Sequence, residues 1–240
     1  MRLKKTRTRV HILVVPDLHL ELGDYDAVSL IETLKKLHCD VMIVAGDLHL
    51  KNCKLSQEAL KIITYLRQAA EEVVFVRGNH DPAPGNWFWK KVVGAKPVRK
   101  FVWEAGGKRL CVMHGHRFDR IYFLFNARWL DKMLSGLVWL VNCLDPGKNH
   151  LAWLIDWAHT RFSNRIAKRA RRYAARRGID VVICAHTHKA LKRRYRPKKG
   201  CAEIVYINCG NREGNQCSFA IIDERGNVKL CRAEAEMVSK

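Results

Sequence analysis

The chain has 240 residues, a formal net charge of +21 and a hydrophobic fraction of 48%. That length suits one domain spanning 1–240, and the hydrophobic fraction excludes a wholly disordered chain. The excess of positive charge predicts attraction to phosphate-rich partners, which include nucleic acid, an anionic membrane surface and a phosphorylated substrate.

The first 80 residues alternate between apolar runs and amphipathic segments. Strands are predicted at 10–15, 41–45 and 73–76, with helices at 27–37 and 56–70 between them. Continuous Val- and Ile-rich runs separated by helices are typical of parallel strands that are covered on both faces. This part of the chain therefore predicts an α/β fold.

The pattern changes after residue 96. Two strand-like runs between 96 and 113 flank Gly106-Gly107, which indicates a hairpin. The segment 120–178 is predicted to be helical, and because it is long for a crossover we interpret it as a helical cap inserted into the single domain. Further strands are predicted at 180–185, 189–196, 204–208, 218–223 and 227–231.

The cysteines and the apolar stretches indicate in which cellular compartment the chain is expected. The nine cysteines are scattered and form no Cys-x-x-Cys pair, which favours buried free thiols in a reducing cytoplasm. The basic N-terminal stretch lacks the apolar core of a signal peptide. The longest apolar stretch, 121–144, contains Arg128, Asp131 and Lys132, so we do not expect it to span a membrane.

Polar motifs follow the apolar runs at their carboxyl ends, where open α/β sheets place their ligand sites. In chain order they are Asp17-Leu-His19, Gly46-Asp47, Gly78-Asn79-His80-Asp81, His114-Gly-His116 and His186-Thr-His188. Carboxylate, carbonyl and imidazole groups suit divalent ions such as Mn²⁺, Fe²⁺ and Zn²⁺. Each motif alone is weak, because Gly-Asp or Asp-x-His is commonly part of a turn. Five of them at successive strand ends predict a metal centre.

The order of these motifs resembles that of the calcineurin-like metallophosphoesterases from about Val10 to the end of the chain. The resemblance implies a two-sheet α/β sandwich flanked by helices. It also implies that two divalent ions lie side by side. One ion would be held by Asp17, His19, Asp47 and His188, and the other by Asp47, Asn79, His114 and His186.

The same resemblance implies that His80 is the general acid that protonates the leaving oxygen. We expect Mn²⁺ first, with Fe²⁺, Zn²⁺ or Mg²⁺ as alternatives. Any such pair of divalent ions would lower the pKa of bound water and stabilise charge on phosphate oxygens. The predicted activity is metal-dependent hydrolysis of phosphate esters or anhydrides. Ala185 stands where the family has glycine, which is tolerable unless that position needs a positive φ.

The segment after His114 resembles that of bacterial UDP-2,3-diacylglucosamine diphosphatases, although Leu48-His49-Leu50 departs from their pattern. The resemblance implies a peripheral-membrane pyrophosphatase of lipid A biosynthesis, whose helical cap accommodates acyl chains. Apolar residues in 120–178 exceed what one core-facing stripe needs, which is consistent with an apolar groove. The candidate substrate contacts are Asn79, Arg128, Trp129, Trp139 and Trp153.

Basic residues form two dense clusters, at 161–177 and 189–199. An anionic membrane surface fits this charge, and nucleic acid fits it equally well. The sequence therefore leaves two substrate classes open. One is a lipid-linked nucleotide at the inner face of the membrane. The other is a phosphodiester of nucleic acid or of a small nucleotide, hydrolysed in the cytoplasm.

Overall fold

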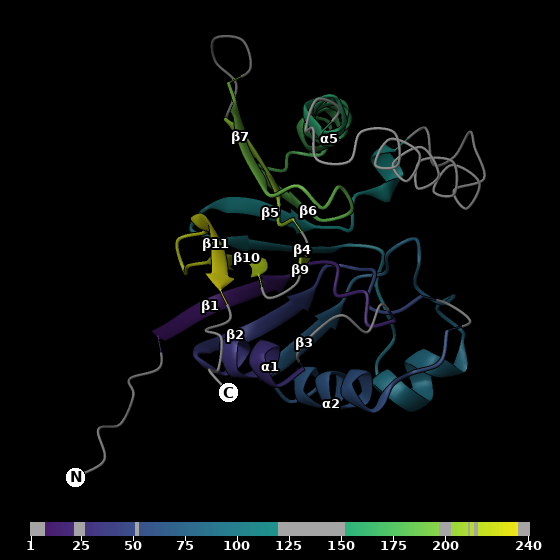
Figure 1. The fold of residues 1–240 in the computed structure, drawn as a ribbon. Helices are drawn as coiled ribbons and strands as arrows, with labels where there is room; N and C mark the ends of the chain where they lie inside the picture. Colours follow the sequence, from purple (N-terminus) through teal and green to yellow (C-terminus); the bar gives the residue numbers. More distant parts are fainter. Residues whose placement is uncertain are drawn as a thin grey trace.

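A computed structural model describes residues 8–21, 27–50, 53–119, 152–196, 203–210, 212–213 and 216–234. In these ranges two β-sheets pack face to face, and helices cover the outer face of each (Figure 1). The two-sheet α/β sandwich predicted from the sequence is confirmed. No helix in the described part of the chain is long and apolar enough to cross a membrane.

The first sheet has the strand order β11-β10-β1-β2-β3, with β9 paired to β10. Its strands are β1 (Thr8–Val15), β2 (Leu37–Val44), β3 (Glu72–Phe75), β9 (Arg212–Glu213), β10 (Gln216–Ile222) and β11 (Val228–Glu234). Strands β1, β2 and β3 are parallel, while β10 is antiparallel to both of its main neighbours. Helices α1 (Ala27–Lys35) and α2 (Gln57–Leu66) connect the parallel strands and cover the outer face of this sheet.

The second sheet has the order β4-β5-β6-β8-β7. Its strands are β4 (Phe101–Ala105), β5 (Lys108–Val112), β6 (Val181–Cys184), β7 (Leu191–Tyr195) and β8 (Ile204–Asn208). The three central strands are parallel, and β4 and β7 form antiparallel edges. The predicted hairpin is confirmed, because β4 and β5 join through Gly106-Gly107.

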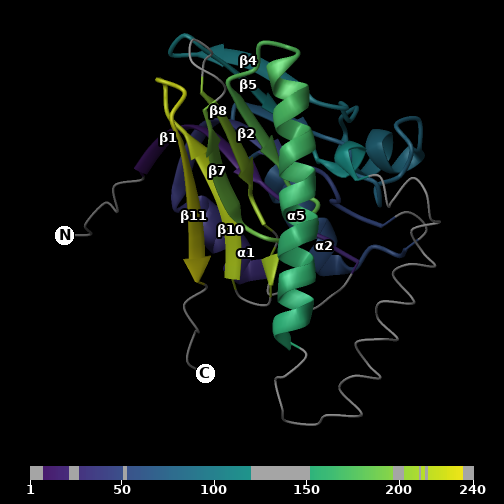
Figure 2. The same cartoon turned by 90° about the horizontal axis from the view of Figure 1, so that it is seen from above.

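Helix α5 (Ala152–Ala175) lies across the outer face of the second sheet (Figure 2). Its apolar side chains Ile166, Ala170 and Ala174 are fully buried against residues of that sheet. The Arg171 guanidinium lies 4.5 Å from the centre of the Tyr195 ring, which joins the helix to edge strand β7. The rest of the predicted cap, including Arg128, Trp129 and Trp139, lies outside the described residues.

Each parallel strand is apolar on both faces because both faces are covered. In β1, Leu13 and Val15 pack toward α1 and α2, while Ile12 and Val14 pack into the layer between the sheets. Burial on two sides replaces the usual alternation of polar and apolar residues with a continuous apolar run. The same continuous pattern in the sequence is what predicted these strands.

Several local elements differ from the sequence prediction. The second helix, predicted at 56–70, spans Gln57–Leu66, and the short strand β9 was not predicted. The first helix ends at Lys35 instead of 37, and β2 begins at Leu37 because Thr8, Arg9 and Val10 of β1 pair with it. This pairing comes from a distant part of the chain, so it overrides the local helical periodicity. A π-helical stretch, η1 (Phe88–Val93), was not predicted, and it buries Phe88 and Trp89 beneath α2 and β3.

Replacing Ile183 by alanine should destabilise the sandwich, because this fully buried side chain lies in the layer between the sheets. We expect a loss of about 2–5 kcal/mol in the free energy of unfolding, measured by urea denaturation. The control Val98→Ala removes atoms from a side chain that is 37% exposed. That control should cost less than about 0.5 kcal/mol, and equal losses in the two variants would contradict the buried layer.

Candidate metal centre

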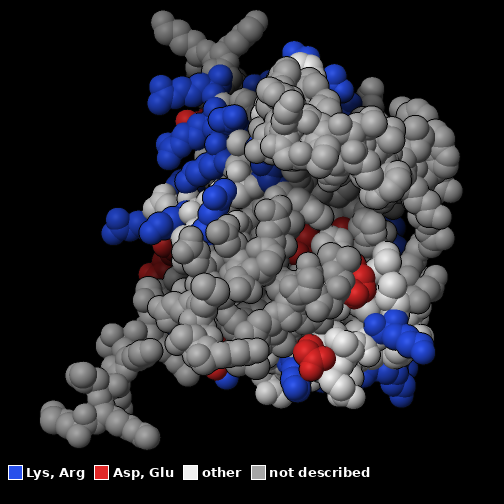
Figure 3. Space-filling model, in the orientation of Figure 1, with Lys and Arg blue, Asp and Glu red and all other residues white. Residues whose placement is uncertain are grey.

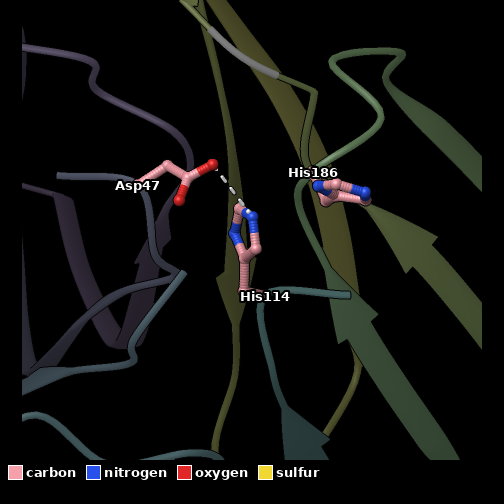
Figure 4. Close-up of side chains that lie close together, drawn as sticks. All are labelled: Asp47, His114 and His186. Carbon is pink, nitrogen blue, oxygen red and sulfur yellow. Dashed lines mark ion pairs between the residues drawn. The ribbon is translucent and has the colours of Figure 1, made fainter. Parts of the chain in front are cut away.

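The predicted ligands lie in loops that leave the carboxyl ends of parallel strands in both sheets. Asp17 follows β1, Asp47 follows β2 and Asn79 follows β3, while His114 follows β5 and His186 follows β6. The sandwich brings these two groups of loops together. Figure 4 shows Asp47 and His114 facing each other from different sheets, with His186 beside them.

The closest group consists of Asp47, His114 and Asn79. The Nε2 atom of His114 lies 3.1 Å from Oδ2 of Asp47 and 2.9 Å from Oδ1 of Asn79. The other ring nitrogen of His114, Nδ1, lies 3.0 Å from the carbonyl oxygen of Ala45, which can only accept a hydrogen bond. When a divalent ion displaces the proton on Nε2, this nitrogen and the two facing oxygens would all be available as ligands. Such a meeting of acceptor atoms fits a cation.

His186 completes this group. Asp47, His114 and His186 each offer a ligand atom, and these atoms all lie within 4.8 Å of one another. The backbone N–H of His186 donates to Oδ2 of Asp17, 2.7 Å away. Its Nε2 lies 3.2 Å from Oδ2 of the buried Asp119. The pattern of a ring nitrogen held by a carboxylate is common for histidine ligands of metals.

The remaining predicted ligands lie beside the first group. Nε2 of His188 is 3.5 Å from Oδ2 of Asp17, and Nε2 of His19 is 3.9 Å from Oδ2 of Asp47. The rings of His19 and His188 have their centres 5.3 Å apart. Nε2 of His19 is buried and has no hydrogen-bond partner. An unsatisfied ring nitrogen next to carboxylates is costly without a ligand, so these residues also fit a cation.

Backbone strain marks the same residues. Four non-glycine residues in the described part of the chain have positive φ: His19 (44°), Asp47 (48°), His186 (70°) and His188 (54°). All four belong to the predicted ligand set. Positive φ is uncommon outside glycine, and each instance persists only where the surroundings impose it. The fold therefore holds these side chains in orientations that relaxed strand ends would not adopt.

Two glycines of the motifs are required by close contacts. A Cβ atom on Gly78 would lie 2.0 Å from Oδ1 of Asp47, and one on Gly46 would lie 2.5 Å from Nδ1 of His114. Gly46 also has a φ of 103°. Ala185, in contrast, is not among the residues with positive φ, so alanine is compatible with the backbone at that position.

The charged groups of the centre shift one another's pKa values. Burial alone would lower the pKa of His114, but the facing carboxylates of Asp47 and Asp17 raise it well above the usual value. Burial would raise the pKa of Asp47, but His114, His80 and His19 together hold it far below the usual range. Asp47 therefore stays ionised, as a metal ligand must.

His80 lies at the edge of the ligand group. Its backbone N–H donates to Oδ1 of Asp47 at 2.9 Å, and its half-buried ring lies 5.5 Å from the ring of His19, measured between centres. The ring is thus placed beside the predicted ligands. Of the predicted substrate contacts, Asn79 lies in the centre and Trp153 lies in α5.

Asp81 and Asp119 support the centre, and no role was predicted for either from the sequence. Asp81 is fully buried and accepts hydrogen bonds from the backbone N–H groups of Asp47, Leu48, His49 and Gly78. Burial and the neighbouring Asp47 carboxylate raise the pKa of Asp81 to about 7, although the donating amides favour its anion. The position of Asp81 in the Gly-Asn-His-Asp motif was a signal, whereas no pattern marked Asp119.

Comparison with known proteins identifies the family. The model of the calcineurin-like phosphoesterase family matches residues 10–190, and this chain belongs to that family. It is a metal-dependent hydrolase of phosphate esters. No curated protein sequence matches the chain.

The chain is also similar in structure to several solved proteins. The E. coli phosphoesterase Yfce is 16% identical with a TM-score of 0.49, covering 94% of this chain and 99% of that one. An archaeal phosphodiesterase is 16% identical with a TM-score of 0.48, covering 92% and 99%. Vps29 of Entamoeba histolytica, complexed with Zn²⁺, is 15% identical with a TM-score of 0.44, covering 94% and 99%.

Replacing Asp81 by asparagine should loosen the loops that carry Asp47 and Asn79. The new amide group would face backbone N–H donors that the carboxylate accepts, so we expect a loss of about 1–3 kcal/mol in the free energy of unfolding by urea denaturation. The control Asp223→Asn changes an exposed carboxylate that also accepts backbone N–H groups. A smaller loss of stability for Asp81→Asn than for Asp223→Asn would contradict the role of Asp81 in holding these loops.

Proposed function

We propose that this chain hydrolyses its phosphorylated substrate at a centre of two divalent metal ions. One ion would be held by Asp17, His19, Asp47 and His188, and the other by Asp47, Asn79, His114 and His186. The observation that carries the proposal is the meeting of carboxylate, amide and imidazole acceptors from both sheets at one edge of the sandwich. Mn²⁺ is the first candidate, since mixed oxygen and imidazole ligands suit it.

Each residue has a distinct task in this proposal. Bound divalent ions would supply a water of lowered pKa and would stabilise negative charge on the phosphate oxygens. Asp47 belongs to both ligand sets, and its two oxygens allow it to connect them. His80, which is held beside Asp47 through its own backbone N–H, would protonate the leaving oxygen. The seven ligands and His80 form one centre within a single domain, 1–240, whose cap comprises 120–178.

The proposed substrate is the pyrophosphate of a lipid-linked nucleotide such as UDP-2,3-diacylglucosamine, hydrolysed at the inner face of the membrane. Support comes from the motif layout after His114 and from the position of α5 beside the centre. The helix residue His159 contacts the carbonyl oxygen of Thr187, between two predicted ligands, through its ring Nε2 at 2.5 Å. A helix that contacts this loop is well placed to shape what enters the centre.

A phosphodiester of nucleic acid or of a small nucleotide is the second candidate, and the surface charge fits it as well as it fits an anionic membrane. One exposed face of α5, together with the turn that follows it, carries basic residues at helical spacing. We call them the α5 row: Arg161, Arg165, Lys168, Arg172 and, directly after the helix, Arg176. Figure 3 shows further Lys and Arg side chains gathered on the side where β7 lies in Figure 1. Trp157, 50% exposed, lies under the guanidinium of Arg161, and exposed aromatic rings beside arginines can stack on bases.

Asp47→Asn should abolish hydrolysis of a small chromogenic phosphodiester in Mn²⁺, because the variant removes the charge that both ligand sets share. We expect a loss of more than about 100-fold in kcat/KM. Chelation with EDTA should remove the activity of the unaltered protein, and added Mn²⁺ should restore it. The charge-matched control Glu58→Gln, on the exposed surface of α2, should retain full activity. Turnover by Asp47→Asn at the control rate would refute the proposed centre.

His80→Gln should separate proton transfer from metal binding. We expect kcat to fall by roughly 10²–10⁴-fold with a poor leaving group, because the general acid is lost. The affinity for Mn²⁺, measured by calorimetric titration, should stay within about twofold because His80 is outside both ligand sets. A parallel fall in metal affinity would instead make His80 a ligand.

The first substrate class requires contact with an anionic membrane and the second requires contact with nucleic acid. Variants of the α5 row can distinguish the two. Neutralising its first four residues to glutamine should weaken flotation with anionic phospholipid vesicles by at least about tenfold, since each basic residue near such a surface contributes about 1 kcal/mol. The control neutralises four exposed lysines near α2 and η1: Lys54, Lys61, Lys90 and Lys91. The control should float as the unaltered protein does. Binding of a single-stranded oligonucleotide at the same salt, without flotation, would favour the second candidate.

A further inference from the structure

We propose that Glu21 is a positioning residue for the metal centre: its carboxylate holds the His19 imidazole in the orientation and tautomer that a metal ion requires. The inference rests on the metal centre proposed above and adds to it a residue that none of the five motifs contains. Glu21 lies two residues after the first motif, in the loop that follows β1, and its side chain is only 7% exposed.

The contact between Glu21 and His19 decides which ring nitrogen faces the centre. Oε1 of Glu21 lies 2.9 Å from Nδ1 of His19. A carboxylate only accepts hydrogen bonds, so Nδ1 carries the proton and the lone pair of the neutral ring is on Nε2. Nε2 is the buried atom without a hydrogen-bond partner, and it faces Oδ2 of Asp47 at 3.9 Å. Histidine ligands of metals are commonly held through their second nitrogen in this way.

The second oxygen of Glu21 fixes the carboxylate itself. Oε2 accepts a hydrogen bond from the backbone N–H of Leu50, 3.0 Å away, in the loop that follows Asp47. It also lies 3.8 Å from Nδ1 of His49. Glu21 is therefore anchored to the loop after β2 while it orients a residue of the loop after β1. Its two oxygens have separate tasks.

Backbone hydrogen bonds join the same two loops independently of Glu21. The N–H of His19 donates to the carbonyl of Asp47, and the N–H of Leu20 donates to the carbonyl of Leu48, both at 3.0 Å. These bonds extend the pairing of β1 and β2 past the strand ends, where His19 and Asp47 adopt positive φ. We therefore expect the pairing of the two loops to persist when the Glu21 carboxylate is lost. The specific consequence of losing it is a His19 ring whose Nδ1 no longer has a carboxylate partner.

Metal binding by Glu21→Gln provides the first test, with Co²⁺ titrated into the full chain and followed by calorimetry and visible absorption. The glutamine oxygen can accept only one of the two hydrogen bonds, and its amide group would oppose the other donor. We expect the affinity for one of two Co²⁺ ions to fall by roughly 10–100-fold. The affinity for the other ion should stay as in the charge-matched control Glu58→Gln. Because one buried donor would face the new amide group, the melting temperature of the metal-free protein should fall by a few degrees, and the titrations are made well below it.

A double-mutant cycle separates positioning from a general effect on the loops. If Glu21 acts through His19, then adding Glu21→Gln to His19→Ala should cause no further loss of Co²⁺ affinity. Additive losses, an equal loss for both ions, or an unaltered affinity in Glu21→Gln would each overturn this inference. Failure of the unaltered protein to bind two Co²⁺ ions would instead overturn the proposed metal centre and this inference with it.

Discussion

The structure of the site depends on the placement of one buried carboxylate, that of Asp47. Its Oδ1 accepts a hydrogen bond from the backbone of His80, and its Oδ2 faces the ring of His114 across the sandwich. Its own backbone is held by Asp81 on one side and by His19 on the other. An ionised group this deeply buried is tolerated only where opposite charge and hydrogen bonds surround it. The loops of both sheets therefore converge on Asp47.

Support for this carboxylate comes from two kinds of contact. Buried acidic side chains tie the loops together, since Asp81 accepts four backbone amides and Glu21 connects the loops after β1 and β2. The absence of a Cβ atom at Gly46 and Gly78 lets neighbouring groups approach to distances that no other residue permits. The positive φ of His19 and Asp47 occurs in these two loops, where the surrounding contacts can offset its cost.

The surface around the centre has a different physical basis. Helix α5 buries its apolar face against the second sheet, so that the α5 row and Trp157 remain outward. The same helix contacts the loop of His186 and His188 through His159. The loops hold the candidate metal centre, while the helix and edge strand β7 carry exposed positive charge.

Much of the fold and of the ligand group could be predicted from the sequence, because both depend on local patterns. Apolar runs predicted the parallel strands, and the Asp-x-His, Gly-Asp and His-Thr-His motifs marked the ends of those strands. The start of β2 at Leu37 could not be predicted, since pairing with the distant β1 decides it. Nor could the strained φ of His19 and Asp47, which results from contacts between loops.

The sequence by itself determined the type of chemistry, because the ligand residues and their order along the chain are local features. Only the tertiary structure decided which atoms meet: it placed Nε2 of His114 against Asp47 and gave Glu21 and Asp119 their contacts with His19 and His186. Those contacts join residues far apart in the chain, or depend on the direction in which a side chain points after a strained turn. Distances of this kind are set by how two sheets pack, which residue order alone does not specify.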